Sequence, residues 1–385
     1  MASGLLNLVV MTPSSAFGTS ATIPLGVAAT VNSVSYITFA TAGALGGQQV
    51  SYSLLDPVNG GPEIGTAIYT SSNATLTNRT PNVSTNGSSY INASSGTLIT
   101  ATLRAQDSTP PFSGRFSYVS SVAVSFTPFR GDLLKINGSL LQISTGGVSG
   151  GSNTSVYVNG SSNTNLASST FYYVYAFNNS GTPTFDFRTD GNGHITDTTA
   201  NNIGVEVRCS SGTNPDPTRT LIGMVRTGSA SQFVDTATQN FVRSWFNEPP
   251  QTLLTEFTST VTTTNTSYSA LSADFTLEFL SFTGENVQFG INGQFFNGTT
   301  NDGAATSIGI DSSTVPQNCL CAITQVSGGF GYPLAIQLNA TGLSEGYHLA
   351  RPLGKAITGG TVSWTGSSQA GFGSVFFATI FGART

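Results

Sequence analysis

Alternating apolar and polar residues dominate this chain and predict β-strands along most of its length. The clearest example is the segment 171–177, where Phe or Tyr occupies every odd position and Tyr, Val or Ala every even one. Both faces of this predicted strand are apolar, so we expect it to be buried on both sides. Residues 184–188 follow after a turn at 178–181, which predicts a β-hairpin, and residues 221–225 supply another strand.

One segment has helical spacing instead. Between residues 232 and 246 the apolar positions are Phe233, Val234, Ala237, Phe241, Val242 and Trp245. Pro249 and Pro250 then end the pattern, because proline lacks the amide hydrogen and its ring clashes with the preceding helical turn. The pattern therefore predicts one short helix near 232–246.

Breaks rich in proline, glycine and serine divide the chain into three predicted modules, residues 1–107, 108–250 and 251–385. In the first module, strand patterns separated by turn residues predict a small antiparallel sheet or barrel. These patterns lie at residues 36–39, 49–55, 64–70, 74–77 and 96–103. The last module holds about nine short strand patterns, for which a jelly roll is the economical arrangement. The expected fold is all-β, with tandem small sandwich or barrel modules ending in a jelly-roll domain.

Composition supports a folded β protein with an unusual surface. Charged residues make up 8% of the 385 residues, against roughly 25% in an average soluble protein. The 25 Phe and 12 Tyr argue against disorder, because disordered segments are poor in aromatic residues. Lys135 and Lys355 are the only lysines, which favours a chain whose surface is largely covered in an assembly. A net charge of -5 without a basic run argues against nucleic-acid binding.

Targeting signals are not evident in the sequence. The first ten residues lack a basic region and a small-residue cleavage site, and no apolar run approaches the roughly 18 residues of a membrane span. We therefore expect a protein made in a cytoplasm, without membrane insertion. Three cysteines do not make a disulfide framework.

The loop from Asp186 to Asp197 is the strongest metal candidate. Asp186, Asp190, Gly191 and Asp197 fall at positions 1, 5, 6 and 12 of a calcium-loop pattern. Arg188 stands at position 3, where a ligand oxygen belongs, and no helix flanks the loop. Asp and Gly are also the residues that ordinary turns require. The turn interpretation is therefore favoured, and we predict no metal.

Other reactive residues are isolated from possible partners. His194 has no second ligand nearby, so we expect it to lie at the surface. Cys319 and Cys321 place two thiols on one face of a strand, but the other zinc ligands would be Cys209, His194 and His348, all distant in sequence. We expect these cysteines to be small apolar residues of the core.

No enzyme motif is recognisable. A serine hydrolase would need a Gly-x-Ser-x-Gly turn and a base, and the chain has two histidines and no such turn. No glycine-rich phosphate loop with a lysine is present. A glycosidase needs only paired carboxylates, and the 18 acidic residues are scattered singly. We therefore predict no catalysis and no cofactor, with a glycan-cleaving protein left open as an alternative.

Several stretches resemble proteins of tailed bacteriophages. Residues 36–56, 63–80 and 84–103 are similar to an N-terminal module of tail-fibre-like and head-appendage proteins, whose pattern is E-x-G-x-G-x-Y followed by T-L-x-R. This chain has Ala67 where that pattern has a second glycine, and Asn78 intervenes before Arg79. Residues 172–177 and 221–247 resemble a domain of tail-associated proteins.

The C-terminal stretch resembles another phage module. LSEGYHLARPLGKAITGGTVSW followed by VFFATIFG is similar to the closing strands of the tumour-necrosis-factor-like jelly rolls that end many phage appendage proteins. In that family three copies pack about a threefold axis, so the resemblance implies a homotrimer. The last strand pattern is apolar on both faces, as expected for a strand partly covered by a neighbouring chain.

Together the resemblances imply a virion protein, a tail-fibre or spike-like appendage made in the bacterial host cytoplasm. Its partners would be further copies of itself, other tail or head proteins, and a glycan or protein of the host surface, which it would bind without turnover. A capsid or tail decoration protein is the alternative within the binding class. A glycan-cleaving tailspike is the alternative of another class.

Overall fold

The computed structural model describes residues 9–42, 44, 46–47, 49–87, 89–102, 113–189, 191–199, 202–324, 331–366 and 373–381. Every regular element in these ranges is a β-strand, so the all-β prediction is confirmed. The chain divides into two compact units, Met1–Thr109 and Pro110–Thr385. The predicted boundary near residue 250 lies within the second unit, and the three-module division stays a prediction.

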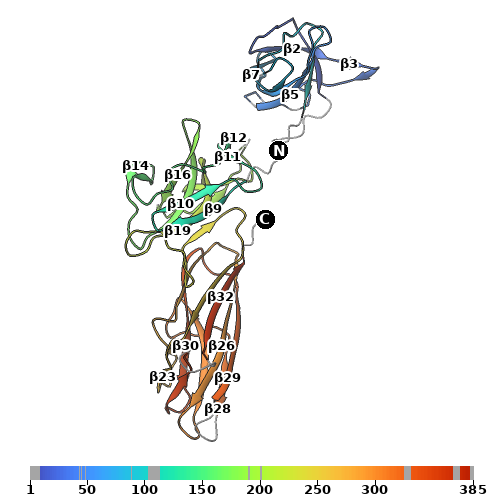
Figure 1. Cartoon of the computed structure of the whole chain (residues 1–385). Helices are drawn as coiled ribbons and strands as arrows, with labels where there is room; N and C mark the ends of the chain where they lie inside the picture. Colours follow the sequence, from blue (N-terminus) through green and yellow to red (C-terminus); the bar gives the residue numbers. More distant parts are fainter. Residues whose placement is uncertain are drawn as a thin grey trace. The chain divides into compact units, whose positions relative to one another are not determined.

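The first unit is a closed barrel, shown in blue in Figure 1, with strand order β1-β2-β7-β6-β5-β8. Its strands are β1 (Val10–Pro13), β2 (Ile23–Ala28), β5 (Gln49–Leu55), β6 (Glu63–Thr70), β7 (Thr75–Ser84) and β8 (Leu98–Ala101). Antiparallel pairing of β1 with β8 closes the ring, which leaves no free sheet edge. A short hairpin, β3 (Thr30–Val31) with β4 (Val34–Ser35), lies outside it.

The sequence predicted most of this barrel. Strands β5 to β8 overlap the predicted segments 49–55, 64–70, 74–77 and 96–103, of which residue 103 lies outside the described residues. The predicted strand at 36–39 is wrong, because only Ile37 forms a bridge, with Val9. Phe39 is nevertheless fully buried, in a turn closed by a hydrogen bond from the Ala44 amide to its carbonyl. The apolar Phe39 side chain therefore packs in the core although its backbone belongs to no strand.

The second unit contains an eight-stranded sheet, called the middle sheet below, with order β14-β13-β16-β15-β19-β18-β17 and β21 paired to β19. Its strands are β13 (Val156–Val158), β14 (Ser161–Thr164), β15 (Phe171–Asn179), β16 (Thr182–Arg188), β17 (His194–Thr196), β18 (Glu206–Ser211), β19 (Asn214–Arg226) and β21 (Val242–Ser244). The predicted hairpin is confirmed, since β15 and β16 pair antiparallel and β15 also pairs with β19. This places β15 in the sheet interior and explains its two apolar faces.

Two further hairpins cover the middle sheet. They are β9 (Arg115–Ser120) with β10 (Ala123–Thr127), and β11 (Leu133–Ile136) with β12 (Ser139–Gln142). Phe116, Phe126 and Leu134 from these hairpins share a core with Tyr172 and Phe187. Burial of that core fixes the inner face of the sheet.

The predicted helix near 232–246 is wrong. This segment forms isolated bridges, Thr227 to Phe233 and Asp235 to Asn240, and then strands β20 (Gln239–Asn240) and β21. Threonine and valine recur along it, and β-branched residues favour extended backbone. Phe233 and Phe241 are buried but Ala237 is exposed, so the apolar spacing does not mark one helical face.

The rest of the second unit is a pair of six-stranded sheets, called the C-terminal sandwich. One has the order β20-β25-β30-β27-β28 with β24 paired to β30, and the other β22-β32-β26-β31-β23 with β29 paired to β26. Their strands are β22 (Gln251–Glu256), β23 (Val261–Thr263), β24 (Ser269–Ala270), β25 (Leu277–Ser281), β26 (Asn286–Asn297), β27 (Gly303–Ile310), β28 (Cys321–Thr324), β29 (Gly331–Ala340), β30 (Gly346–Ala356), β31 (Val362–Trp364) and β32 (Val375–Phe381).

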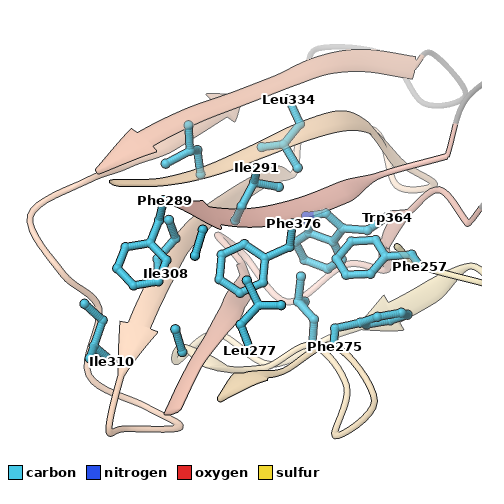
Figure 2. Close-up of a cluster of buried hydrophobic side chains, with 14 of the residues drawn as sticks. Phe257, Phe275, Leu277, Phe289, Ile291, Ile308, Ile310, Leu334, Trp364 and Phe376 are labelled. Carbon is cyan, nitrogen blue, oxygen red and sulfur yellow. The ribbon is translucent and has the colours of Figure 1, made fainter. Parts of the chain in front are cut away.

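One apolar core joins the two sheets of the sandwich. Figure 2 shows Phe289, Ile291 and Phe376 of one sheet near Leu277 and Ile308 of the other. Trp364 is fully buried among them, and its indole Nε1 donates to Thr306 Oγ1 at 2.8 Å. The indole thus buries a large apolar surface without an unpaired polar atom.

Candidate functional site

The charged residues of the N-terminal motif form a buried ion pair inside the barrel. Arg79 Nε and Nη2 each donate to one oxygen of Glu63 at 2.7 Å, and both side chains are fully buried. Tyr52 and the Ile91 amide donate to the same carboxylate, at 2.6 and 2.9 Å. The remaining Arg79 donors reach main-chain carbonyls, including that of Ser20 at 3.0 Å. This ion pair therefore stabilises the barrel, and its charged groups are already engaged within the protein.

The extra residue before Arg79 has a structural explanation. Asn78 takes a left-handed φ of 53°, and the β6–β7 register shifts between Thr66 and Ile68. An added residue on one strand is a β-bulge, which re-aims the neighbouring side chain. Asn78 is therefore part of a bulge that lies directly before Arg79.

A depression of about 320 Å³ lies on the surface of the second unit. Its lining residues are Ser169, Arg226, Gly228, Ser229, Ala230, Gln232, Val234, Gln239 and Phe241. We call it the Arg226 depression. Arg226 ends β19, and its guanidinium lies 5.0 Å from the Phe241 ring centroid and 4.1 Å from that of Tyr347. Two aromatic rings therefore hold the cation in place.

The carboxylate nearest to Arg226 is occupied by other donors. Glu278 Oε2 lies 3.9 Å from Arg226 Nη1, too far for a hydrogen bond. Glu278 instead accepts from Tyr347 at 2.5 Å and from Gln239 Nε2 at 2.8 Å. Among the described residues, none accepts a hydrogen bond from the Arg226 side chain. The depression thus contains a cation with donors available to a ligand.

A second depression, of about 250 Å³, offers a contrast. Arg219 lines it, but the Arg219 Nε donates to Asp186 Oδ2 at 2.8 Å, and its Nη1 donates to Thr218 Oγ1 at 3.2 Å. Its guanidinium also lies 4.4 Å from the Phe177 ring centroid. The Arg219 guanidinium already donates hydrogen bonds within the protein, so this depression is the weaker candidate.

His194 lies where the middle sheet meets the C-terminal sandwich, and its side chain is 14% exposed. The prediction of a surface histidine is therefore wrong. Its Nδ1 lies 2.5 Å from Glu206 Oε1 on β18, and its Nε2 lies 2.9 Å from Glu345 Oε1 just before β30. The Trp245 ring packs edge-on at 4.8 Å. We call this set the His194 junction.

Charge stabilises the His194 junction. Burial disfavours the imidazolium, but hydrogen bonds to Glu206 and Glu345 outweigh it and raise the pKa of His194 to about 9. Burial also opposes ionisation of Glu345, yet its bonds to His194 lower the pKa of that carboxyl to about 2. Tyr173 donates to Glu345, and burial together with this carboxylate raises the pKa of the phenol.

The junction predicts a loss of stability at alkaline pH. Because the folded pKa of His194 is raised from 6.5 to about 9, its contribution is complete below pH 6.5 and is lost as pH rises through 9. We expect the free energy of unfolding to fall by on the order of 2 kcal/mol over that window. His194→Gln, which does not titrate, should lack this fall in urea unfolding measured at each pH. Parallel curves for both proteins would contradict the assignment.

Arg243 and two carboxylates form a second buried contact between the middle sheet and the sandwich, called the Arg243 cluster. Arg243 donates to Glu248 at 3.1 Å, to Glu285 at 3.0 Å and to the Leu280 carbonyl at 2.7 Å. The side chains of Arg243, Glu248 and Glu285 are 0%, 7% and 2% exposed. Burial raises the pKa of Glu248 against the opposing charge of Arg243.

The carboxylates of the calcium candidate are engaged by the protein. Asp186 Oδ2 accepts from Arg188 at 2.9 Å and from Arg219 at 2.8 Å, so two cations surround the proposed ligand. Asp197 accepts from the Thr199 amide and from Asn202. Asp190 lies outside the described residues. Two arginines beside one carboxylate disfavour a divalent cation there.

Calcium should therefore leave stability unchanged. We expect the melting temperature of the full chain to differ by less than about 1 °C between millimolar calcium and excess chelator, since a ligand that does not bind the native state cannot stabilise it. Differential scanning calorimetry tests this directly. A calcium-dependent rise of several degrees would restore the calcium interpretation.

The cysteines contribute to packing. Cys209 is buried, and its thiol donates to the Gly212 carbonyl at 3.0 Å. Cys319 and Cys321 are half-buried against the sandwich core. The prediction that both lie on one strand is wrong, because β28 begins at Cys321. Within the described ranges there is no cluster of three or more His, Cys, Asp or Glu residues arranged for a metal. His348, also named as a possible ligand, bonds instead to Asp311 and the Ser344 carbonyl, each at 2.7 Å.

Comparisons with known proteins add no identification. No protein-family model matches the chain, and no curated protein matches it. In the described part, no helix has the length and hydropathy to cross a bilayer.

Solved structures give only weak similarity. An insecticidal delta-endotoxin from Bacillus thuringiensis aligns over 70% of this chain and 51% of its own, at 8% identity and TM-score 0.16. A mosquito-larvicidal toxin from the same species aligns over 90% and 55%, at 9% identity and TM-score 0.18. A structure of infectious bursal disease virus aligns over 96% and 77%, at 12% identity and TM-score 0.15. The chain spans about half the length of the two toxins, and these TM-scores support no inference.

The sequence did not mark the Arg226 depression or the two buried contacts. Arg226 ends a strand that was correctly predicted, but its neighbours Tyr347 and Glu278 are distant in sequence. A lone arginine at the end of an apolar strand was the only local sign of it. Pairing of His194 with Glu345 likewise depends on contact between the middle sheet and the sandwich, which residue spacing cannot show.

Proposed function

We propose that this chain is a structural subunit of a tailed-bacteriophage particle, a tail-fibre or spike-like appendage that binds the host surface without catalysis. The tandem all-β construction with few charges is the observation that supports it most. In this proposal the barrel unit attaches to the particle, and the sandwich is a tumour-necrosis-factor-like jelly roll that faces the host. The closing-strand resemblance at residues 343–364 and 375–382 supports the jelly-roll assignment.

The outer face of one sandwich sheet supports a homotrimer. Across β22, β32, β26 and β29, the central row of this face is Leu254, Phe377, Gly290 and Gln337. Leu254 is 50% exposed although apolar, and the Phe377 ring packs against Gly290. Glu256 is the one charged residue among the described strand residues of this face. An apolar and amide surface of this kind suits contact with a second copy.

Light scattering tests the trimer. The full chain should have a mass close to three times 39.8 kDa. Leu254→Glu should reduce this mass, because charges placed across a symmetric interface repel and are buried. Asn339→Asp, which adds the same charge at the edge of the face, is the matched control. A monomer mass for folded wild-type chain would exclude the trimer.

The positions of the carboxylates favour binding of a glycan without its cleavage. Glu206 and Glu345 both bond to His194, Glu63 pairs with Arg79, and neither depression is lined by an acidic residue. A glycosidase needs two carboxyl groups facing one substrate. A glycan-cleaving tailspike is therefore the less supported alternative, and it predicts that purified protein shortens surface glycans.

Adsorption of particles that carry this chain tests the adhesive role. Monovalent antibody fragments against the sandwich should block adsorption to host cells at saturating concentration. If the chain is instead a capsid or tail decoration protein, the fragments will bind the particle and leave adsorption unchanged. That outcome would replace the adhesive proposal with the decoration alternative.

A further inference from the structure

The Arg226 depression is a preformed site with a defined rim. The Ser169 amide donates to the Gly228 carbonyl at 2.9 Å, and the Gly228 amide donates to the Gln232 carbonyl at 2.8 Å. Thr227, next to the lining residues Arg226 and Gly228 in sequence, is fully buried, and its hydroxyl donates to the Ala167 carbonyl at 2.6 Å. Main-chain and buried hydroxyl bonds therefore hold the loop in shape, which lowers the entropy cost of binding a ligand there.

The chemistry of the lining selects the kind of ligand. Arg226 is the only charged residue among the lining residues, and Ser169, Ser229 and Gln232 add hydroxyl and amide groups to the lining. Val234 and Phe241 add an apolar side. A guanidinium with available donors recognises a carboxylate by paired hydrogen bonds, whereas hydroxyls and amides suit sugar hydroxyls. A volume of about 320 Å³ is at the lower end of small-molecule sites and suits a single sugar ring.

The environment of Arg226 keeps it available. Phe241 and Tyr347 lie against the guanidinium, and Glu278 is held at 3.9 Å by its bonds to Tyr347 and Gln239. An incoming carboxylate therefore need not displace a hydrogen-bonded partner of Arg226. We infer that the Arg226 depression binds a carboxylate-bearing sugar, such as a uronic acid unit of a surface glycan. This inference rests on the proposed adhesive function and names the class of its ligand.

Glucuronate is the probe that tests this site, with glucuronamide as its uncharged match. The full chain should bind glucuronate saturably in ligand-observed saturation-transfer NMR, and glucuronamide at least about 10-fold more weakly, because charge-assisted bonds are stronger than neutral ones. Arg226→Gln should weaken glucuronate binding about 10- to 100-fold. Arg130→Gln, which removes an exposed arginine of the same unit, should have no effect.

A second variant separates ligand contact from folding. Arg226 also touches the sandwich through Tyr347, so Arg226→Gln can disturb the chain. Ala230 is exposed on the rim, and Ala230→Trp should fill the depression and abolish binding without touching that contact. Equal affinity for glucuronate and glucuronamide, no glucuronate binding by the wild type, or unchanged binding by folded Ala230→Trp would each overturn the inference.

Whole-cell binding distinguishes failure of this site from failure of the proposed function. If wild type and Arg226→Gln bind cells equally, the acidic-sugar site is wrong and the adhesive role stands. If the wild type binds glucuronate through Arg226 but binds no cells, the sugar site stands and the adhesive role fails.

Discussion

Glu63→Gln should destabilise the barrel by about 3–5 kcal/mol, because it leaves the buried Arg79 guanidinium without its counter-charge. Arg79 donates two bonds of 2.7 Å to this carboxylate, and neither side chain reaches solvent. Hydrogen exchange of the full chain, followed by mass spectrometry, should show lost protection in peptides from β5 to β8. Peptides from the C-terminal sandwich should keep their protection.

Two companion variants identify the cause. Tyr52→Phe removes one neutral donor to the Glu63 carboxylate and should cost about 1.5–3 kcal/mol, less than Glu63→Gln. Glu63→Met combined with Arg79→Met removes both charges, so it should recover much of the stability lost by Glu63→Gln. If Glu63→Gln lowers protection no more than Tyr52→Phe does, the Glu63–Arg79 ion pair is not what stabilises the barrel.

Arg243→Met should weaken the second unit by about 3–5 kcal/mol at neutral pH. The substitution leaves Glu248 and Glu285 buried beside each other, although Glu248 keeps its bond from the Ser244 amide and Glu285 its bond from the Phe282 amide. Urea unfolding followed by tryptophan fluorescence measures the loss, since Trp245 lies on the middle side of this contact and Trp364 lies in the sandwich core. A loss below about 1 kcal/mol, typical of a surface pair, would contradict the buried role of Arg243.

The loss caused by Arg243→Met should shrink as pH falls. Burial already raises the pKa of Glu248, and removal of the opposing Arg243 charge raises it further. A carboxyl with a raised folded pKa binds its proton before the unfolded chain does, so acid relieves the penalty. Adding Glu248→Gln and Glu285→Gln to Arg243→Met should remove both the penalty and its pH dependence. A deficit that stays constant from pH 7 to pH 4.5 would exclude carboxylate repulsion as the cause.

The alternation of apolar and polar residues predicted the strands and hairpins formed by segments that are neighbours in sequence. The β15–β16 hairpin and strands β5 to β8 follow from period-2 apolar positions and turn residues. The helix prediction failed because Phe233 and Phe241 have near-helical spacing yet are buried by different neighbours, Phe187 for the first and Tyr347 for the second. Apolar spacing identifies the residues that are buried, but tertiary contacts decide the backbone that buries them.

The candidate site depended on contacts that cross the second unit. Arg226 meets Tyr347 of β30, and His194 meets Glu345, more than a hundred residues later in each case. The spacing of residues along the sequence carries no information on such long-range contacts. The calcium interpretation, by contrast, could be weighed from the sequence, because Arg188 lies inside the proposed ligand loop. In the structure Arg188 donates a hydrogen bond to Asp186, one of the proposed ligands.

Binding of the purified full chain to bacteria tests adhesion without turnover. Fluorescently labelled chain, verified as folded, is titrated onto candidate host cells, and the bound label and the length of the surface glycan are followed for several hours. We expect saturable binding that soluble surface glycan competes away, with a stable plateau and unchanged glycan length. Absence of saturable binding, or glycan that shortens while the label is released, would contradict it.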